Sequence, residues 1–126
     1  MSAKILIVED SRSMRRIVRS ALESDGYQVA ESEDGRQALN ALREVAPHLI
    51  ITDVNMPEVD GISLVREIRR LPSFRFTPVL ILTTESGEDM KENGRAAGAT
   101  GWIVKPFDPD QLRQVVAHVL KARGVA

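Results

Sequence analysis

The chain has 126 residues, with 17 lysines and arginines against 18 aspartates and glutamates, which gives a formal net charge of -1. That length fits one domain, and the near balance of charge excludes the strongly basic field typical of a nucleic-acid-binding protein. The sequence has no cysteine for disulfides or zinc-thiolate sites, and no apolar run approaches the roughly 18 residues of a membrane span, so we expect a soluble, cytoplasmic protein.

Segments typical of strands and of helices alternate along the chain. Short apolar runs predict strands at residues 5–8, 49–53, 79–82 and 101–104, with a weaker one at 27–31. Apolar residues at helical spacing predict a helix after each strand. The first carries Met14, Ile17, Val18, Ala21 and Leu22 and ends at Asp25-Gly26, and the others cover 35–45, 62–71, 88–97 and 109–122.

Several of the predicted strands are continuous apolar runs without alternation, which indicates burial on both faces of a parallel sheet with helices on both sides. The pattern is therefore an α/β fold of the (βα)5 type. We expect it to occupy residues 1–126 as a single domain, without an output domain.

The predicted strands end on residues that carry charges or hydroxyl groups. Because the carboxyl ends of parallel strands share one edge, where open α/β sheets bind their ligands, these residues form one candidate site. They are Glu9 and Asp10, Asp53, Thr83 and Thr84, and Lys105. Such a combination of carboxylates, hydroxyls and an ammonium suits a cation together with a phosphoryl group.

The carboxylates predict a metal site. Glu9 and Asp10 are adjacent and repel each other unless a cation is bound, and hard oxygen ligands favour magnesium. In the alternative interpretation, Ser11 or Asp10 simply caps the helix that follows. Asp53 favours the metal site, because a carboxylate placed after a run of buried aliphatic residues is costly unless it is paired or coordinated. Beside magnesium, an aspartate can act as a nucleophile toward phosphorus.

The hydroxyls and the ammonium complete the candidate site. Thr83 or Thr84 can hydrogen bond one phosphoryl oxygen, and Lys105 can pair with another. Taken singly, the threonines fit ordinary β propensity and the lysine fits a surface residue. Pro106 favours the functional interpretation, since a residue before proline is extended and Lys105 would then project over the sheet edge.

These motifs give the sequence a family resemblance that covers essentially the whole chain. It resembles the receiver domain of two-component response regulators, and most closely the stand-alone chemotaxis regulators of the CheY type. The resemblance implies a flavodoxin-like, doubly wound sheet of parallel strands in the order 2-1-3-4-5. The residues that carry it are 8–11, 14–19, Asp53-Val54-Asn55-Met56-Pro57, Asp60-Gly61, Thr83 and 98–107.

The resemblance implies a phosphoacceptor and a metal. Asp53 would take a phosphoryl group from a phosphohistidine of a partner kinase. Asp10, Asp53 and the backbone carbonyl of Asn55 would hold Mg2+ directly. Glu9 would reach the metal through water, although aspartate is commoner at this position, so Glu9 departs from the family pattern.

The resemblance also implies the groups around the phosphoryl group. Thr83 and Lys105 would bind its oxygens, and the Lys105-Pro106 peptide would be cis. Asn55 and Glu85 would border the water that hydrolyses the phosphoryl group.

Trp102 stands at the family's aromatic switch position, although by itself it fits an ordinary core tryptophan. The resemblance implies that phosphorylation draws Thr83 toward the phosphoryl group and turns the ring of Trp102 inward. The face formed by 88–97, 101–104 and 109–122 would then change. Gly94, inside the first of these segments, costs about 1 kcal/mol relative to alanine and indicates a loosely held helix.

The partners implied are a CheA-like histidine kinase or phosphotransfer protein, and a flagellar motor switch or other effector on the switching face. We expect a monomer that binds no nucleic acid. Arg12, Arg15, Arg16 and Arg19 recur at helical spacing and form either a solvated stripe or a docking surface for the kinase.

Other functions remain open. The protein could be a phosphate sink or a phosphorelay intermediate outside chemotaxis. A small-molecule phosphatase with an aspartyl-phosphate intermediate is less favoured, because haloacid dehalogenases need an aspartate where Asn55 stands. A flavodoxin-like carrier is also disfavoured, because Glu9 and Asp10 would repel a flavin phosphate.

Overall fold

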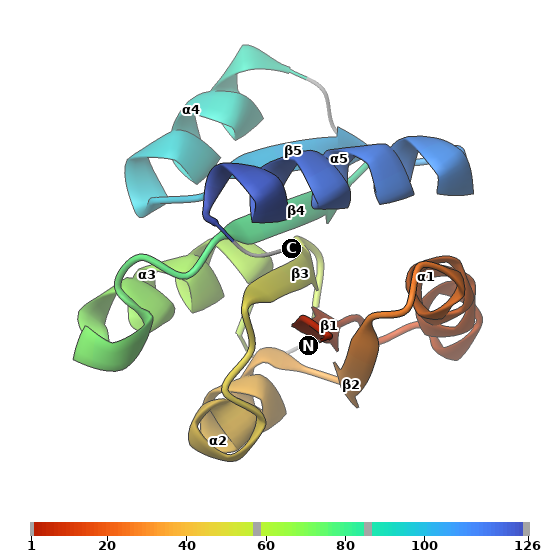
Figure 1. Ribbon diagram of the computed structural model, residues 1–126. Helices are drawn as coiled ribbons and strands as arrows, with labels where there is room; N and C mark the ends of the chain where they lie inside the picture. Colours follow the sequence, from red (N-terminus) through yellow and green to blue (C-terminus); the bar gives the residue numbers. More distant parts are fainter. Residues whose placement is uncertain (1, 57–58, 85–86, 125–126) are drawn as a thin grey trace.

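A single parallel sheet organises the computed structural model, which describes residues 2–56, 59–84 and 87–124 (Figure 1). Its strands lie in the order β2-β1-β3-β4-β5, which confirms the order implied by the family resemblance. The strands are β1 (Lys4–Val8), β2 (Gln28–Ser32), β3 (Leu49–Asp53), β4 (Val79–Thr83) and β5 (Gly101–Val104).

A helix follows each strand, as predicted. The helices are α1 (Arg12–Ser24), α2 (Gly35–Val45), α3 (Gly61–Arg70), α4 (Glu88–Ala97) and α5 (Pro109–Ala122). Side-chain caps fix where helices begin, because each oxygen accepts a hydrogen bond from an otherwise unpaired backbone N–H. Ser11 caps α1 and Asp60 caps α3, so the α1 cap comes from Ser11 and the carboxylate of Asp10 does not supply it.

The helices cover both faces of the sheet. Figure 1 shows α1 and α5 on one side and α2, α3 and α4 on the other, and each group packs on its own cluster of buried apolar residues. Strands β3 and β4 are buried along their whole length, which explains the apolar runs at 49–51 and 79–82. None of the helices within the described residues is long and apolar enough to cross a membrane.

The prediction was wrong for two residues of α1. Ile17, predicted on the apolar face, is 48% exposed, whereas Arg15, predicted on the basic stripe, is only 9% exposed. The centre of the buried face lies between Val18 and Leu22, and Arg15 falls on it at the i, i+3, i+7 spacing. A continuous stripe of four arginines on α1 is therefore absent.

Smaller differences concern the ends of elements. The second strand begins and ends one residue later than the predicted 27–31, and β4 extends to Thr83. A short 3-10 helix, η1 (Pro72–Phe74), follows α3 and was not predicted. None of these differences moves a candidate site residue away from the carboxyl edge of the sheet.

Candidate functional site

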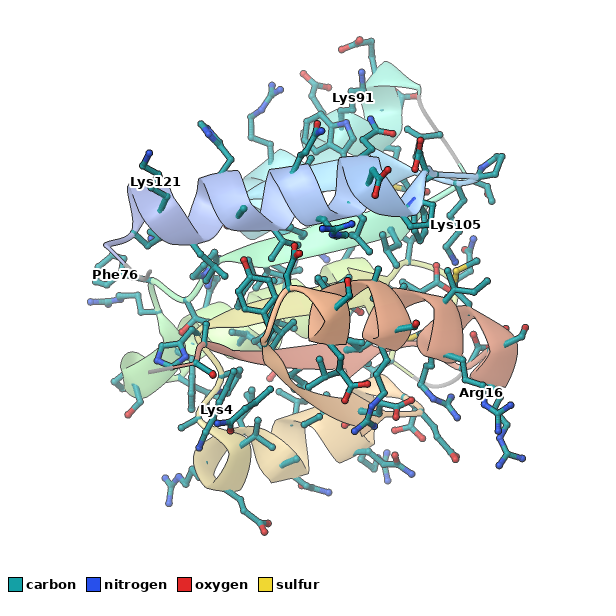
Figure 2. All side chains as sticks on the ribbon, turned by 45° about the vertical axis from the view of Figure 1, so that its right-hand side comes forward. Lys4, Arg16, Phe76, Lys91, Lys105 and Lys121 are labelled. Atoms are coloured by element: carbon teal, nitrogen blue, oxygen red, sulfur yellow. The ribbon has the colours of Figure 1, made fainter. Side chains whose placement is uncertain are left out.

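The strand registers bring the predicted site residues together at the carboxyl edge of the sheet. Val8 is paired with Thr52, Asp53 with Leu82 and Thr83 with Val104. Glu9, Asp53, Thr83 and Lys105 therefore emerge side by side from the ends of four neighbouring strands. Figure 2 shows Lys105 at the opposite end of the molecule from Lys4, where β1 begins.

Three carboxylates form a cluster at this edge, as predicted. Glu9, Asp10 and Asp53 each offer an oxygen, and these oxygens lie within 4.8 Å of one another. Glu9 and Asp53 are buried, and Asp10 is exposed. The side-chain hydrogen bond with Glu9, together with burial and the neighbouring negative charge, raises the pKa of Asp10. This crowded set of oxygen ligands fits a divalent cation such as Mg2+.

Lys105 bridges two of these carboxylates. Its Nζ donates to Glu9 Oε1 at 2.8 Å and to Asp53 Oδ1 at 3.1 Å. Burial acts to lower the pKa of Lys105, but the hydrogen bonds and charges of Glu9 and Asp53 outweigh it, so the pKa is raised. The peptide between Lys105 and Pro106 is cis, as the family resemblance implies.

The two oxygens of Asp53 have different surroundings. Oδ1 accepts hydrogen bonds from Lys105 Nζ and, at 2.9 Å, from the backbone N–H of Val54. Oδ2 has no hydrogen-bond partner among the residues that the structure describes. The carboxylate is thus held through one oxygen while the other is available for a metal or a phosphoryl group.

A glycine allows α3 to start directly beneath Asp53. The N–H of Gly61 donates to the carbonyl of Val54 at 2.9 Å. A Cβ at Gly61 would overlap the backbone carbonyl of Asp53. Only a residue without a side chain fits this approach, so the Asp60-Gly61 motif supports the backbone of the site as well as capping α3.

The remaining predicted residues lie around this centre. Thr83 is buried, and its backbone carbonyl accepts a hydrogen bond from the N–H of Lys105 at 2.7 Å. Thr84 and Asn55 are exposed, in the bends that follow β4 and β3. Glu85 lies outside the described residues, as does Pro57 of the family motif, so the predicted place of Glu85 in the site stays a prediction.

Trp102 lies on β5, further from the carboxylates, and is partly buried against the α2–α3–α4 side of the core. Two cations of α4 lie over its ring. Lys91 Nζ is 5.6 Å from the ring centroid, and the guanidinium carbon of Arg95 is 5.9 Å from it. These are cation–π distances, so the tryptophan is in contact with α4 as well as with the core.

One residue at the site was missed by sequence reasoning. The buried Arg15 donates through Nη1 to the backbone carbonyl of Glu9 at 2.6 Å and through Nε to Glu31 Oε1 at 3.1 Å. Its spacing from Val18 and Leu22 could have revealed its burial, but a carbonyl acceptor has no signature in the sequence.

Sequence comparisons agree with this geometry. The sequence profile of the response regulator receiver domain matches residues 5–117. The chemotaxis protein CheY1 of Helicobacter pylori is 40% identical over 119 residues, which cover 93% of this chain and 96% of that protein.

Solved structures lead to the same family. CheY4, a chemotaxis protein of Vibrio cholerae, superposes with a TM-score of 0.92 at 43% identity, covering 95% of this chain and 100% of that one. The receiver domain of the sensor histidine kinase PA1611 from Pseudomonas aeruginosa, with magnesium coordinated in its active-site cleft, gives 0.85 at 30% identity and covers 94% and 97%. The chain therefore belongs to the response regulator receiver domains of two-component signalling, and it is a CheY-like signalling switch.

Proposed function

We propose that this protein acts as a single-domain response regulator, of the kind used in chemotaxis, in which Asp53 accepts a phosphoryl group. The donor would be the phosphohistidine of a CheA-like kinase or of a phosphotransfer protein. Asp53 Oδ2 would form the bond to phosphorus as the N–P bond of the donor breaks and its imidazole nitrogen keeps the electron pair. Membership in the family and the position of Asp53 at the centre of the acidic cluster support this assignment.

The observation that carries the proposal is the asymmetric environment of Asp53. Lys105 and the N–H of Val54 hold Oδ1, and this leaves Oδ2 as the reactive oxygen. A carboxylate 6% exposed between these donors has a fixed orientation, which an in-line attack on phosphorus requires.

Magnesium fits the acidic cluster, since its members are oxygen donors drawn close together. Asp10, Asp53 and the backbone carbonyl of Asn55 would hold it, with Glu9 acting through water. When bound, it would neutralise charge on the carboxylates and on the incoming phosphoryl group.

The residues around Asp53 would stabilise the phosphorylated state and limit its lifetime. The ammonium of Lys105 would move from the carboxylates to a phosphoryl oxygen, and the hydroxyl of Thr83 would donate to another. Asn55 and Glu85 would border the attacking water. Movement of Thr83 would be coupled to the ring of Trp102, and so to the effector-binding face formed by α4, β5 and α5.

The test is phosphorylation of the full chain by a phosphorylated histidine kinase, or by acetyl phosphate with Mg2+, followed by mass spectrometry. We expect one phosphoryl group on Asp53, lost in the Asp53→Asn variant and retained in Asp89→Asn, which alters an exposed carboxylate of α4 outside the cluster. Phosphorylation that persists in Asp53→Asn at the wild-type rate would contradict the proposal, as would its independence of Mg2+.

A further inference from the structure

Arg15 is a buried cation at the edge of the acidic cluster, and the phosphoryl chemistry proposed above does not use it. It is 9% exposed, although it lies on the N-terminal half of a surface helix. Its guanidinium reaches both β2 and the residue that follows β1: Nη1 donates to the carbonyl of Glu9 at 2.6 Å, and Nε donates to Glu31 at 3.1 Å. Arg15 therefore joins three elements at the place where the metal-site residues leave β1.

The carbonyl that Arg15 binds belongs to the peptide joining Glu9 to Asp10. Because a peptide group is planar, a hydrogen bond to its oxygen also fixes the direction of the N–H of Asp10. The N–H of Glu9 is held on the other side, where it donates to the carbonyl of Ser32 at 3.1 Å. Between them, Arg15 and Ser32 set the directions in which the Glu9 and Asp10 side chains leave the backbone.

The side chain of Glu9 is held as well. Oε1 accepts from Lys105, and Oε2 accepts from the N–H of Ser11 at 3.2 Å. Asp10, in contrast, is exposed, and apart from its side-chain hydrogen bond with Glu9 its position depends on the backbone that carries it. The backbone anchor supplied by Arg15 is thus most consequential for Asp10.

Neighbouring arginines show that this arrangement is specific to one position. Figure 2 shows Arg16, the next residue, extending away from the protein, and it is exposed. Arg19 lies one turn further along α1, and among the residues that the structure describes it pairs with Glu23 and with the same Glu31 but not with Glu9. Arg15 and Arg19 therefore share an acidic partner and differ in the contact with the metal-site loop.

We propose that Arg15 is a positioning residue for the magnesium site, which orients the Glu9–Asp10 peptide so that both carboxylates converge on the cation. This inference rests on the proposed function, since it concerns the same site. A rigid guanidinium can serve two acceptors in fixed directions, whereas a lysine ammonium at the end of a flexible chain cannot reproduce that fork. Outer-shell contacts of this kind commonly control metal affinity.

The positive charge of Arg15 by itself would weaken Mg2+ binding, whereas its positioning role would strengthen it. A positive charge beside the cluster repels Mg2+, so deleting it without disturbing the geometry would tighten binding. The Arg15→Lys variant keeps the charge and removes the fork, which separates positioning from electrostatics. Arg19→Lys makes the same chemical change on the same helix. It alters the ion pair with Glu31 but leaves the hydrogen bond between Arg15 and the Glu9 carbonyl in place.

The experiment is a calorimetric titration of the full-length protein with MgCl2 alone, without a phosphoryl donor. We expect Arg15→Lys to weaken Mg2+ affinity about tenfold. Arg19→Lys should stay close to the wild-type value. Equal affinities for Arg15→Lys and the wild type would overturn the proposal, and so would equal weakening in both lysine variants, because that would indicate a general loosening of α1.

A second matched pair covers the case in which Arg15→Lys fails to fold. Glu31→Gln and Glu33→Gln each remove one negative charge from the same edge of the molecule. Glu31 is hydrogen-bonded to Arg15, whereas Glu33 lies 4.0 Å from Nη2 of Arg15. We expect weaker Mg2+ binding in Glu31→Gln than in Glu33→Gln, and equal binding would overturn the proposal.

Different results would overturn the positioning role of Arg15 and the proposed function of the site. If the wild type binds Mg2+ and is phosphorylated on Asp53 while the Arg15 and Glu31 variants bind as it does, only the positioning role is lost. If the wild type binds no Mg2+, both the proposed function and the positioning role are overturned.

Discussion

Lys105 is the single residue on which the electrostatic balance of the site most depends. It pairs with two carboxylates, on Glu9 and Asp53, whose residues are 1% and 6% exposed. Buried carboxylates are costly unless a cation or hydrogen-bond donors compensate them. The longer side chain of Glu9, where the family more often has aspartate, is the one that meets Lys105 at 2.8 Å. In the metal-free protein, the ammonium therefore takes part of the role that a divalent cation would have.

Replacing Lys105 by methionine keeps an unbranched side chain of similar length and removes the charge. We expect the free energy of unfolding of the metal-free protein to fall by about 1–3 kcal/mol at neutral pH, because charge-assisted hydrogen bonds to buried acceptors are lost. Urea denaturation of Lys105→Met measures this loss, with Lys121→Met on the exposed side of α5 as the control. Equal stabilities of Lys105→Met and the wild type would contradict the expectation.

The same pair of proteins gives a pH dependence. The folded-state pKa of Lys105 is raised above its ordinary 10.5, so the folded protein holds this proton more tightly than the unfolded chain. The stability that Lys105 contributes is therefore fully present below pH 10.5 and is lost as pH rises through the raised pKa. Between neutral pH and pH 10.5 the difference in unfolding free energy between the wild type and Lys105→Met should stay constant, and it should narrow above pH 10.5. A difference that already narrows between pH 7 and pH 10.5 would count against the assignment.

At the scale of single residues, the sequence predicted which side chains lie at the site but not how they pair. Glu9, Asp53 and Lys105 follow apolar runs, and strand ends in a parallel sheet must share an edge. That Lys105 joins Glu9 to Asp53 depends on side-chain directions across the sheet, which have no local signature. Arg15 was misplaced because its charge was taken to indicate exposure, whereas its helical position indicates the core.

At the scale of elements, the packing role of Gly94 in α4 could not be predicted from the sequence, and the loosely held helix that it indicates stays a prediction. Gly94 is buried, and a Cβ there would lie 3.3 Å from Ile81 Cδ1. The glycine therefore allows α4 to pack closely on β4. The helix boundaries, in contrast, were predicted well, because Gly98 ends α4 in the left-handed conformation that favours glycine.

Because Trp102 on β5 contacts α4, we expect its fluorescence to report switching. It is the only tryptophan in the sequence, and Lys91 and Arg95 lie over its ring. Each cation–π contact is worth about 0.5–1 kcal/mol when exposed, so a change elsewhere of similar size can shift the ring. We expect the emission of Trp102 to change when acetyl phosphate and Mg2+ are added.

Asp53→Asn is the control for this measurement, since the same additions should leave its emission at the Mg2+-only value. The double variant Lys91→Met/Arg95→Met should also alter the emission of the unphosphorylated protein, because both cations leave the ring environment. Unchanged emission in a sample that mass spectrometry finds phosphorylated would exclude Trp102 as part of the switch.

At the scale of the whole molecule, we expect magnesium binding to be coupled to folding. The acidic cluster joins the ends of β1 and β3, which are far apart in sequence and adjacent only in the folded sheet. A ligand that binds only the folded state stabilises it, by about 2.7 kcal/mol at a concentration a hundredfold above its Kd. In the metal-free protein, the pKa of Asp10 is raised by its side-chain hydrogen bond with Glu9, by burial and by the negative charge of Glu9.

The substitution Asp10→Asn should therefore raise the stability of the metal-free protein and lower the stability of the protein in excess Mg2+, relative to the wild type. The pKa of Asp10 is raised above its ordinary 3.8, so at neutral pH the ionised carboxylate favours the unfolded chain. With chelator present, we expect Asp10→Asn to unfold at a higher urea concentration than the wild type. In excess Mg2+ the order should invert, because the variant has lost a metal ligand and gains little from the cation.

The control is Asp89→Asn, which changes an exposed carboxylate on α4 and should keep the wild-type response to Mg2+. If Mg2+ stabilises Asp10→Asn as much as the wild type, Asp10 is not a ligand, and the cluster does not couple metal binding to folding in this way.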